Sequence, residues 1–193
     1  MKTQKNKCAP ALLAFVLLLA TLAVDASRPA LSRGSSAREI DREATQSLAN
    51  LFTNTPDAKV LADKAVAVLV FPRIVKGGFI IGGQFGDGAL RKNGKSVAYY
   101  RSLAASYGFQ AGIQAFGYVL FFMDDESVQY LNNSDGWELG VGPSLVVLDS
   151  GFGKNLSTTT LQKGVYAFIF DQTGLMAGMG IQGTKITKIN PNP

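Results

Sequence analysis

Ile80-Ile-Gly-Gly-Gln-Phe-Gly-Asp-Gly88 is an unusual strand sequence, because glycine or glutamine occupies every second position from Gly82 onward. The same alternation returns in Ser106-Tyr-Gly-Phe-Gln-Ala-Gly-Ile-Gln114 and in Met176-Ala-Gly-Met-Gly-Ile-Gln-Gly183. Alternate side chains of a strand point to the same face, so each segment places its glycines and glutamines on one face. The residues predicted to share this face are Gly82, Gln84, Gly86, Gly88, Gly108, Gln110, Gly112, Gln114, Gly178, Gly180 and Gln182.

Glycine inside a strand usually marks a bulge, a tight bend or the close approach of another backbone. Three strands with glycine on one face therefore predict a strongly curved sheet, or a sheet on which another segment packs very closely. Two interpretations of this face stay open at this point. It is either a tightly packed seam in which glutamine amides pair with each other, or a polar groove for a ligand.

The N-terminus has the features of a secretory signal. Three lysines precede an apolar run over residues 9–24, and a small-residue cleavage site follows, so residues 1–26 are the predicted signal peptide. Ser27 is then the first mature residue, and residues 27–35 form a polar, flexible leader. The apolar run is short for a membrane span, which needs about 20 residues, so a retained anchor is the less favoured alternative.

The residue types needed for common catalytic chemistry are missing. The chain has no histidine, and its one cysteine, Cys8, precedes the apolar run and lies outside any lipoprotein cleavage motif. Cleavage after residue 26 would leave a mature chain without cysteine, which excludes disulfides, thiol catalysis and thiolate metal sites. We therefore predict no catalytic residues, no metal site, no cofactor and no enzymatic activity.

Two motif matches do not change that prediction. Residues 178–183 match G-x-G-x-x-G, but a dinucleotide site needs a helix after the glycines, and only 10 residues follow this segment. The acidic run Asp124-Asp-Glu126 suits a helix N-terminus better than a calcium loop. The net charge of +5 falls to +3 without residues 1–26, because they hold three lysines and Asp25. This mild excess predicts attraction to anionic surfaces and no nucleic-acid partner.

Residues 36–193 read as a single domain. A capping box at Ser36 begins a helix whose apolar residues recur at helical spacing up to Phe52. A second helix covers residues 55–64, with proline at its first position, and a third covers residues 124–131.

The remainder of the domain has the pattern of β-strands. An apolar run over residues 65–71 is closed by Pro72, and further strands are predicted over residues 78–84, 86–91, 96–101, 106–122, 137–141, 144–148, 165–170, 175–182 and 184–189. Short turns join these strands, which favours antiparallel pairing because parallel strands need long crossovers. The predicted fold is α+β, with two N-terminal helices packed on a strongly curved, mainly antiparallel β-sheet or barrel-like roll.

Several segments resemble the SYLF domain family, whose eukaryotic members bind membranes and actin. They are Val70–Phe79, Gly88–Arg91, Ser106–Gly112, Ser134–Ser144, Leu156–Leu161, Val165–Phe170, Gly174–Gly178 and Gly183–Thr187, and the likeness covers residues 36–190. The resemblance implies lipid binding, with anionic phospholipids or phosphoinositides as the ligands of eukaryotic members. It also implies that an amphipathic N-terminal helix contributes to membrane contact, and residues 36–52 occupy the equivalent place. It implies no catalytic residues.

The predicted lipid-binding residues combine cations with apolar side chains. Headgroup contacts are expected from Arg38, Arg42, Arg73 and Lys76, and apolar contacts from Leu48, Leu51 and Phe52 if the first helix can leave the sheet. Basic residues around the Asn93-Gly94 turn, Arg91 among them, are compatible either with headgroups or with a solvated turn.

The sequence thus predicts a secreted, non-catalytic module of a bacterial envelope that binds anionic phospholipid headgroups. The expected location is periplasmic or secreted, with peripheral association with a membrane surface. The alternative is an envelope protein-interaction scaffold without lipid affinity, in which the first helix only packs on the sheet and the partner is another envelope protein.

Overall fold

The computed structural model of the chain describes residues 35–78, 81–107, 112–148, 163–174, 181 and 183–193. The chain divides into two units, residues 1–34 and residues 35–193, and all the described residues belong to the second. Among these residues, no helix is long and apolar enough to cross a membrane.

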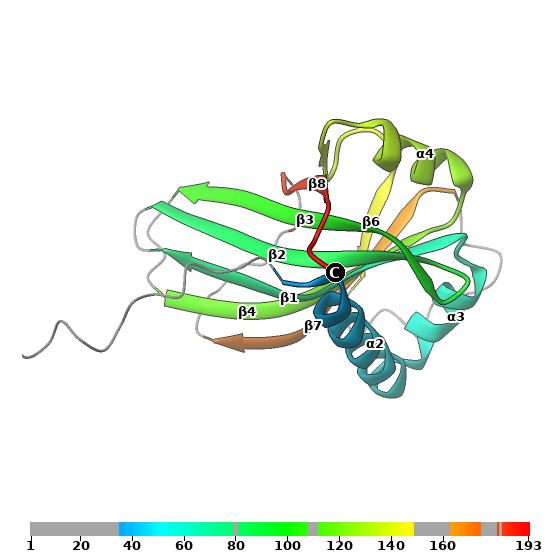
Figure 1. Cartoon of the computed structure of the whole chain (residues 1–193), viewed down its shortest axis with the longest axis horizontal. Helices are drawn as coiled ribbons and strands as arrows, with labels where there is room; N and C mark the ends of the chain where they lie inside the picture. The colour runs from blue at the N-terminus through cyan, green and yellow to red at the C-terminus, as the bar shows by residue number, and fades with distance from the viewer. Residues whose placement is uncertain (1–34, 79–80, 108–111, 149–162, 175–180, 182) are drawn as a thin grey trace, which may run out of the picture. The chain divides into compact units, whose positions relative to one another are not determined.

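Three helices and eight strands form the described part of this unit (Figure 1). The helices are α2 (Ala37–Asn54), α3 (Pro56–Lys64) and α4 (Asp125–Asn133). The strands are β1 (Ala67–Gly78), β2 (Ile81–Lys92), β3 (Lys95–Tyr107), β4 (Gly112–Phe122), β5 (Trp137–Glu138), β6 (Leu145–Leu148), β7 (Val165–Gly174) and β8 (Lys185–Ile189). The strands make one sheet in the order β5-β8-β3-β2-β1-β4-β7-β6, and of the pairs described only β6–β7 is parallel. The predicted α+β fold is confirmed: the N-terminal pair of helices packs on a strongly curled, mostly antiparallel half-barrel.

The helix starts predicted from the sequence are confirmed. The Ser36 hydroxyl accepts a hydrogen bond from the backbone N–H of Glu39 at 3.3 Å, and Pro56 occupies the first position of α3. Asp124 caps α4 by accepting from the N–H of Ser127 at 2.8 Å. These caps satisfy backbone donors that have no partner within the helix.

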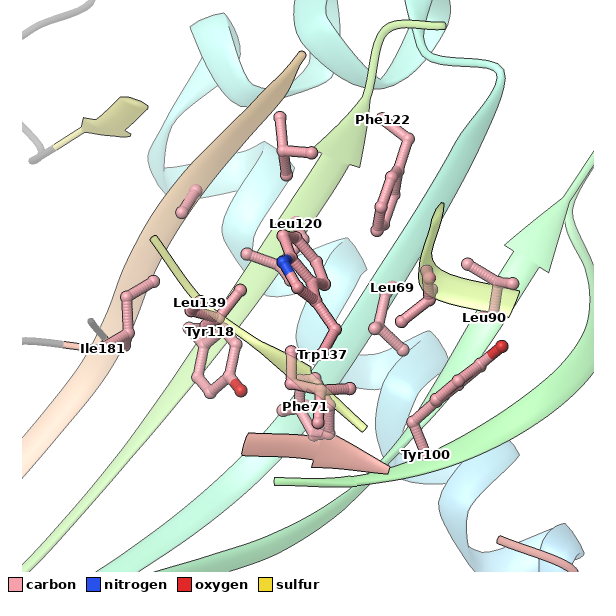
Figure 2. Close-up of a cluster of buried hydrophobic side chains, with 14 of the residues drawn as sticks. Leu69, Phe71, Leu90, Tyr100, Tyr118, Leu120, Phe122, Trp137, Leu139 and Ile181 are labelled. Carbon is pink, nitrogen blue, oxygen red and sulfur yellow. The ribbon is translucent and has the colours of Figure 1, made fainter. Parts of the chain in front are cut away.

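The sheet buries both of its faces. On the inner face, side chains from β1, β3 and β4 pack with Trp137 of β5 (Figure 2). Val128 and Leu131 of α4 belong to the same cluster. On the outer face, Ile40, Ala44 and Leu51 of α2 and Leu61 of α3 pack on the central strands. Strand β4 serves both cores, which explains its unbroken apolar sequence: Phe116, Tyr118, Leu120 and Phe122 face inward, whereas Val119 and Phe121 face outward.

Several strand predictions were wrong in their boundaries, including residues 137–141, of which only Trp137–Glu138 form a strand. Pro72 does not end the first strand, because β1 continues to Gly78 through a shift in register between Phe71 and Ile74. Such an irregularity accommodates a residue that cannot donate to the ladder. The predicted strands at 78–84 and 86–91 are one strand, β2, and the predicted strand at 106–122 is divided between β3 and β4. Most of the strand predicted at 175–182 lies outside the described residues.

The predicted glycine face is confirmed where the structure describes it. Gly88 pairs with Tyr100, an inner-core residue, and Gly82 and Gly112 both pair with Gly78 of β1. A Cβ atom placed on Gly88 would lie 2.3 Å from the carbonyl oxygen of Val70 in β1. The close approach of a neighbouring backbone is therefore the reason for glycine at this position.

Candidate functional site

A groove of about 540 Å³ lies between α2, the start of β1 and the turn that joins β2 to β3. Its wall is mainly apolar, with Leu48 and Phe52 from α2, Ala62 from α3 and Val68 from β1. Arg91, near the end of β2, supplies a cationic side chain. Ligand pockets in proteins have volumes of about 300–1,000 Å³ and are mostly apolar with a few polar groups, so the groove has the size and lining of a binding site.

The guanidinium of Arg91 is held by α2 without a direct ion pair. Its Nη2 donates to the backbone carbonyl of Asp41 at 2.9 Å and to the hydroxyl of Thr45. Its Nε is buried and has no hydrogen-bond partner. Among the residues that the structure describes, no carboxylate lies within ion-pair distance of Arg91.

The carboxylate of Asp41, whose backbone carbonyl accepts from Arg91, is engaged elsewhere. It accepts hydrogen bonds from Ser96 Oγ and from Tyr99 Oη, the latter at 3.0 Å. Burial raises the pKa of Tyr99, and the hydrogen bond to Asp41 raises this pKa further. The groove therefore contains the cation Arg91, and it also contains the carboxylate of Asp63, which forms an ion pair with Lys59.

Four of the predicted lipid-binding residues lie on or beside the groove. Leu48 and Phe52 line it, and both also pack partly against the outer core. Arg38 and Arg42 are exposed on α2, about two turns and one turn before Thr45, so they extend the same flank of the helix. Leu51 instead faces the sheet and is only 4% exposed, so it supplies apolar contact to the core.

Arg73 and Lys76 lie in the other half of β1. At about 3.3 Å per residue, Lys76 lies roughly 26 Å along the strand from Val68 in the groove. Lys76 also pairs with Gln114, one row beyond the pair of Ile74 and Phe116 in the inner core. Lys76 thus belongs to the inner face, whereas α2 covers the outer face. The structure does not bring the seven predicted residues together into one site.

Of the residues that line the groove only Leu48 and Phe52 were in the predicted set, and Thr45 and Arg91 were not. Arg91 carried a sequence signal as part of the basic cluster around the Asn93-Gly94 turn. Its position beside α2 depends on contacts between residues 46 positions apart in the chain, which no local spacing predicts.

A second cavity, of about 790 Å³, lies beside α4 and includes Asp124, Tyr130 and Lys163 in its lining. Both carboxylate oxygens of Asp124 are occupied, one by the N–H of Ser127 and the other by the N–H of Gly164 at 2.6 Å. Burial raises the pKa of this carboxyl, but the hydrogen bonds from Ser127 and Gly164 outweigh that effect and the net pKa is lowered. Asp124 therefore acts as a structural cap in this cavity.

Part of the chain is similar to a known protein family. No curated protein matches the chain. Residues 103–191 match the family model described as "Ysc84: Las17-binding protein actin regulator". The match covers the end of β3 and the strands that follow, and the groove lies before it in the chain, on α2, α3, β1 and β2. Residues 103–191, a little under half of the chain, are therefore similar to the Ysc84 family, whose domains are binding modules associated with actin and lipids.

Proposed function

We propose that the protein is a non-catalytic module of a bacterial envelope that binds anionic phospholipid. The groove beside α2 carries this proposal, because it combines an apolar wall with the charge of Arg91, which has no ion-pair partner among the described residues. An amphiphile with an anionic headgroup has the matching chemistry. Its apolar part would contact Leu48 and Phe52, and its headgroup would contact Arg91.

The exposed cations of α2 extend this match beyond the groove. Arg38 and Arg42 lie on the same flank of the helix, where they can meet headgroups of neighbouring lipids. Each basic residue near an anionic membrane surface contributes about 1 kcal/mol of attraction. The association of the Ysc84 family with lipid binding supports the same function.

Export is the second part of the proposal. A signal peptide over residues 1–26 would deliver the mature chain to the periplasm or the cell exterior, and the module would associate with the membrane peripherally. Residues 35–193 contain both hydrophobic cores as one compact unit, so a chain that begins at Ser27 keeps the complete folded domain.

The decisive experiment is co-sedimentation of residues 27–193 with vesicles of anionic or neutral phospholipid. We expect binding to anionic vesicles only, and weaker binding at high salt, because the Debye length falls from about 10 Å at 0.1 M to about 3 Å at 1 M. Reversal of two charges in Arg38→Glu with Arg42→Glu should weaken binding. The matched control is Lys185→Glu with Lys188→Glu, which reverses two exposed charges on β8.

The groove itself is tested by tryptophan substitutions at two consecutive positions of α2. Ala49 lines the groove and Asn50 does not, although both are exposed. Ala49→Trp should fill the groove and reduce affinity about tenfold, equivalent to 1.4 kcal/mol, whereas Asn50→Trp should leave it unchanged. Equal, negligible sedimentation with anionic and neutral vesicles would reject lipid binding. The chain would then be better explained as a scaffold for another envelope protein, in keeping with the protein binding that the family's description names.

A further inference from the structure

A polar row crosses the inner face of the sheet, at the opposite end of β1 from the groove. Gln84 of β2 pairs with Lys76 of β1, and Lys76 pairs in turn with Gln114 of β4. Residues paired directly across a sheet project from the same face, so these three side chains stand next to one another. Both glutamines are buried, with exposed fractions of 5% and 4%, whereas Lys76 is only half-buried.

The two glutamines of this row differ in their hydrogen bonds. Gln84 Nε2 donates to the hydroxyl of Thr184 at 2.8 Å, so it holds the segment before β8 against the sheet. Gln114 Oε1 is buried and accepts no hydrogen bond. The amides of Gln84 and Gln114 do not pair with each other, and the other two glutamines predicted on this face, Gln110 and Gln182, lie outside the described residues. A buried acceptor without a donor is unfavourable, and it marks a place where a ligand donor would be accommodated.

Lys76 adds a cation to this row. Among the described residues, no carboxylate lies within ion-pair distance of its ammonium group. Its flexible side chain is the direct neighbour of Gln114, so its movement can open a path to the buried oxygen. The next row on the same face consists of Gly82, Gly78 and Gly112, which have no side chains to fill the space above the backbone.

We propose that Lys76 and Gln114 form a site for a hydroxyl-bearing phosphate ester on the inner face of the sheet. Lys76 binds the phosphate as a point charge, and Gln114 Oε1 accepts a hydrogen bond from a hydroxyl of the ligand. This chemistry occurs in glycerophosphate, either as a soluble molecule or as the headgroup of phosphatidylglycerol. The site is separate from the groove beside α2 and does not require it.

The ligand chemistry is tested by nuclear magnetic resonance on residues 27–193, with the side-chain amide signals of Gln114 and Gln84 as reporters. Titration with sn-glycerol 3-phosphate should shift the Gln114 signal. Propyl phosphate has the same charge but no hydroxyl. Its affinity should be lower by at least about tenfold, because a site built for a hydroxyl discriminates against ligands that lack it. Lys76→Met should abolish binding of both ligands, whereas Lys95→Met, at the exposed first position of β3, should leave it unchanged. Equal affinity for the two ligands, or undiminished binding in Lys76→Met, would overturn the proposal.

A matched pair of substitutions tests the buried acceptor independently of any ligand. Gln114→Leu removes an acceptor that has no donor, so it should raise the midpoint of thermal unfolding and also abolish the preference for glycerol phosphate. Gln84→Leu removes the partner of the fully buried Thr184 hydroxyl, so it should lower the midpoint. If Gln114→Leu lowers the midpoint as Gln84→Leu does, Gln114 has a structural partner and the proposed site is wrong.

Vesicle sedimentation shows whether the ligand is a lipid headgroup or a soluble molecule. It also allows the inner site and the proposed lipid function to fail independently. Weaker sedimentation of Lys76→Met with phosphatidylglycerol vesicles would identify the lipid headgroup as the source. Binding of glycerol phosphate by a protein that ignores all vesicles would support the inner site with a soluble ligand and reject the lipid function. Binding of vesicles without any response to glycerol phosphate would reject the inner site alone.

Discussion

At the scale of single residues, the strictest limits on residue type come from the close approach of a neighbouring backbone and from the geometry of caps and turns. Gly88 lies where the carbonyl of Val70 leaves no space for a Cβ atom, whereas Gly94 has open space around it and a positive φ of 76°. The first glycine is required by a neighbouring strand and the second by the geometry of its own turn.

Alanine substitutions at these two glycines should therefore differ in effect. Gly88→Ala requires β1 and β2 to move apart and should cost several times more than Gly94→Ala, whose left-handed conformation costs about 1–2 kcal/mol. Urea denaturation of the two variants measures the difference. Equal losses would mean that the sheet adjusts freely at Gly88.

Asp124 gives the fold an acid-sensitive contact. The pKa of its carboxyl is lowered in the folded state, so its stabilising effect is complete above the unfolded pKa of about 4 and is lost as the pH falls through the lower folded value. Asp124→Asn has one side-chain oxygen in place of two and cannot accept from both Ser127 and Gly164. We expect the variant to melt below the native protein at pH 7, and the difference to shrink as the pH falls below about 4 and through the lower folded pKa of Asp124. A constant difference over that range would contradict this account.

At the scale of the element, α2 combines two roles on different sides of one helix. Ile40, Ala44 and Leu51 anchor it to the outer face of the sheet, and Leu48 and Phe52 border the groove. The groove exists only while the helix remains in place, because α2 provides one of its walls. Membrane contact by α2 is therefore expected to use its exposed flank, with the buried side still packed on the sheet.

Leu51→Ala tests whether α2 binds lipid while it is packed on the sheet or only after it leaves the sheet. Truncation of this buried side chain should cost about 2–5 kcal/mol of stability, measured by urea denaturation. If α2 binds lipid in the docked position, the variant should bind anionic vesicles no better than the native protein. Increased vesicle binding would show instead that release of the helix limits the interaction. Gln46→Ala, at an exposed position of α2 that does not line the groove, is the control for general effects of substitution near the groove.

At the scale of the whole molecule, the proposed binding features lie on opposite faces of one sheet. The groove with Arg91 is on the outer face, and the row that contains Lys76 is on the inner face. Both cores and both features consist of residues from 35–193. A chain without residues 1–26 therefore keeps every one of these residues.

The export proposal makes a direct prediction about the mature chain. Protein recovered from the bacterial envelope should begin at Ser27 and lack both Cys8 and any lipid attached to it. Intact-mass measurement distinguishes this chain from the full-length product. A mass that corresponds to lipid-modified Cys8 would show that the protein is anchored covalently.

Local sequence patterns were sufficient to predict the elements that depend on residues close together in the chain. Helical spacing and caps predicted α2, α3 and α4, and strand alternation predicted that Gly82, Gln84, Gly112 and Gln114 share a face. The unbroken apolar run of β4 also agrees with the burial of this strand on both faces. These signals depend on residues a few positions apart, which is the range over which backbone geometry fixes the direction of side chains.

Tertiary structure decided the features that depend on pairing between distant segments. Pro72 was expected to end a strand, but the register shift in β1 lets the ladder continue past it. Lys76 and Arg38 are both basic residues, but the sheet separates them. Lys76 belongs to the inner face, whereas Arg38 lies on α2, which covers the outer face. Arg91 joins the groove because the packing of α2 on the sheet brings it to Thr45, 46 residues away. Such contacts arise from the packing of the complete sheet, so local patterns can supply the residues of a site but not their arrangement.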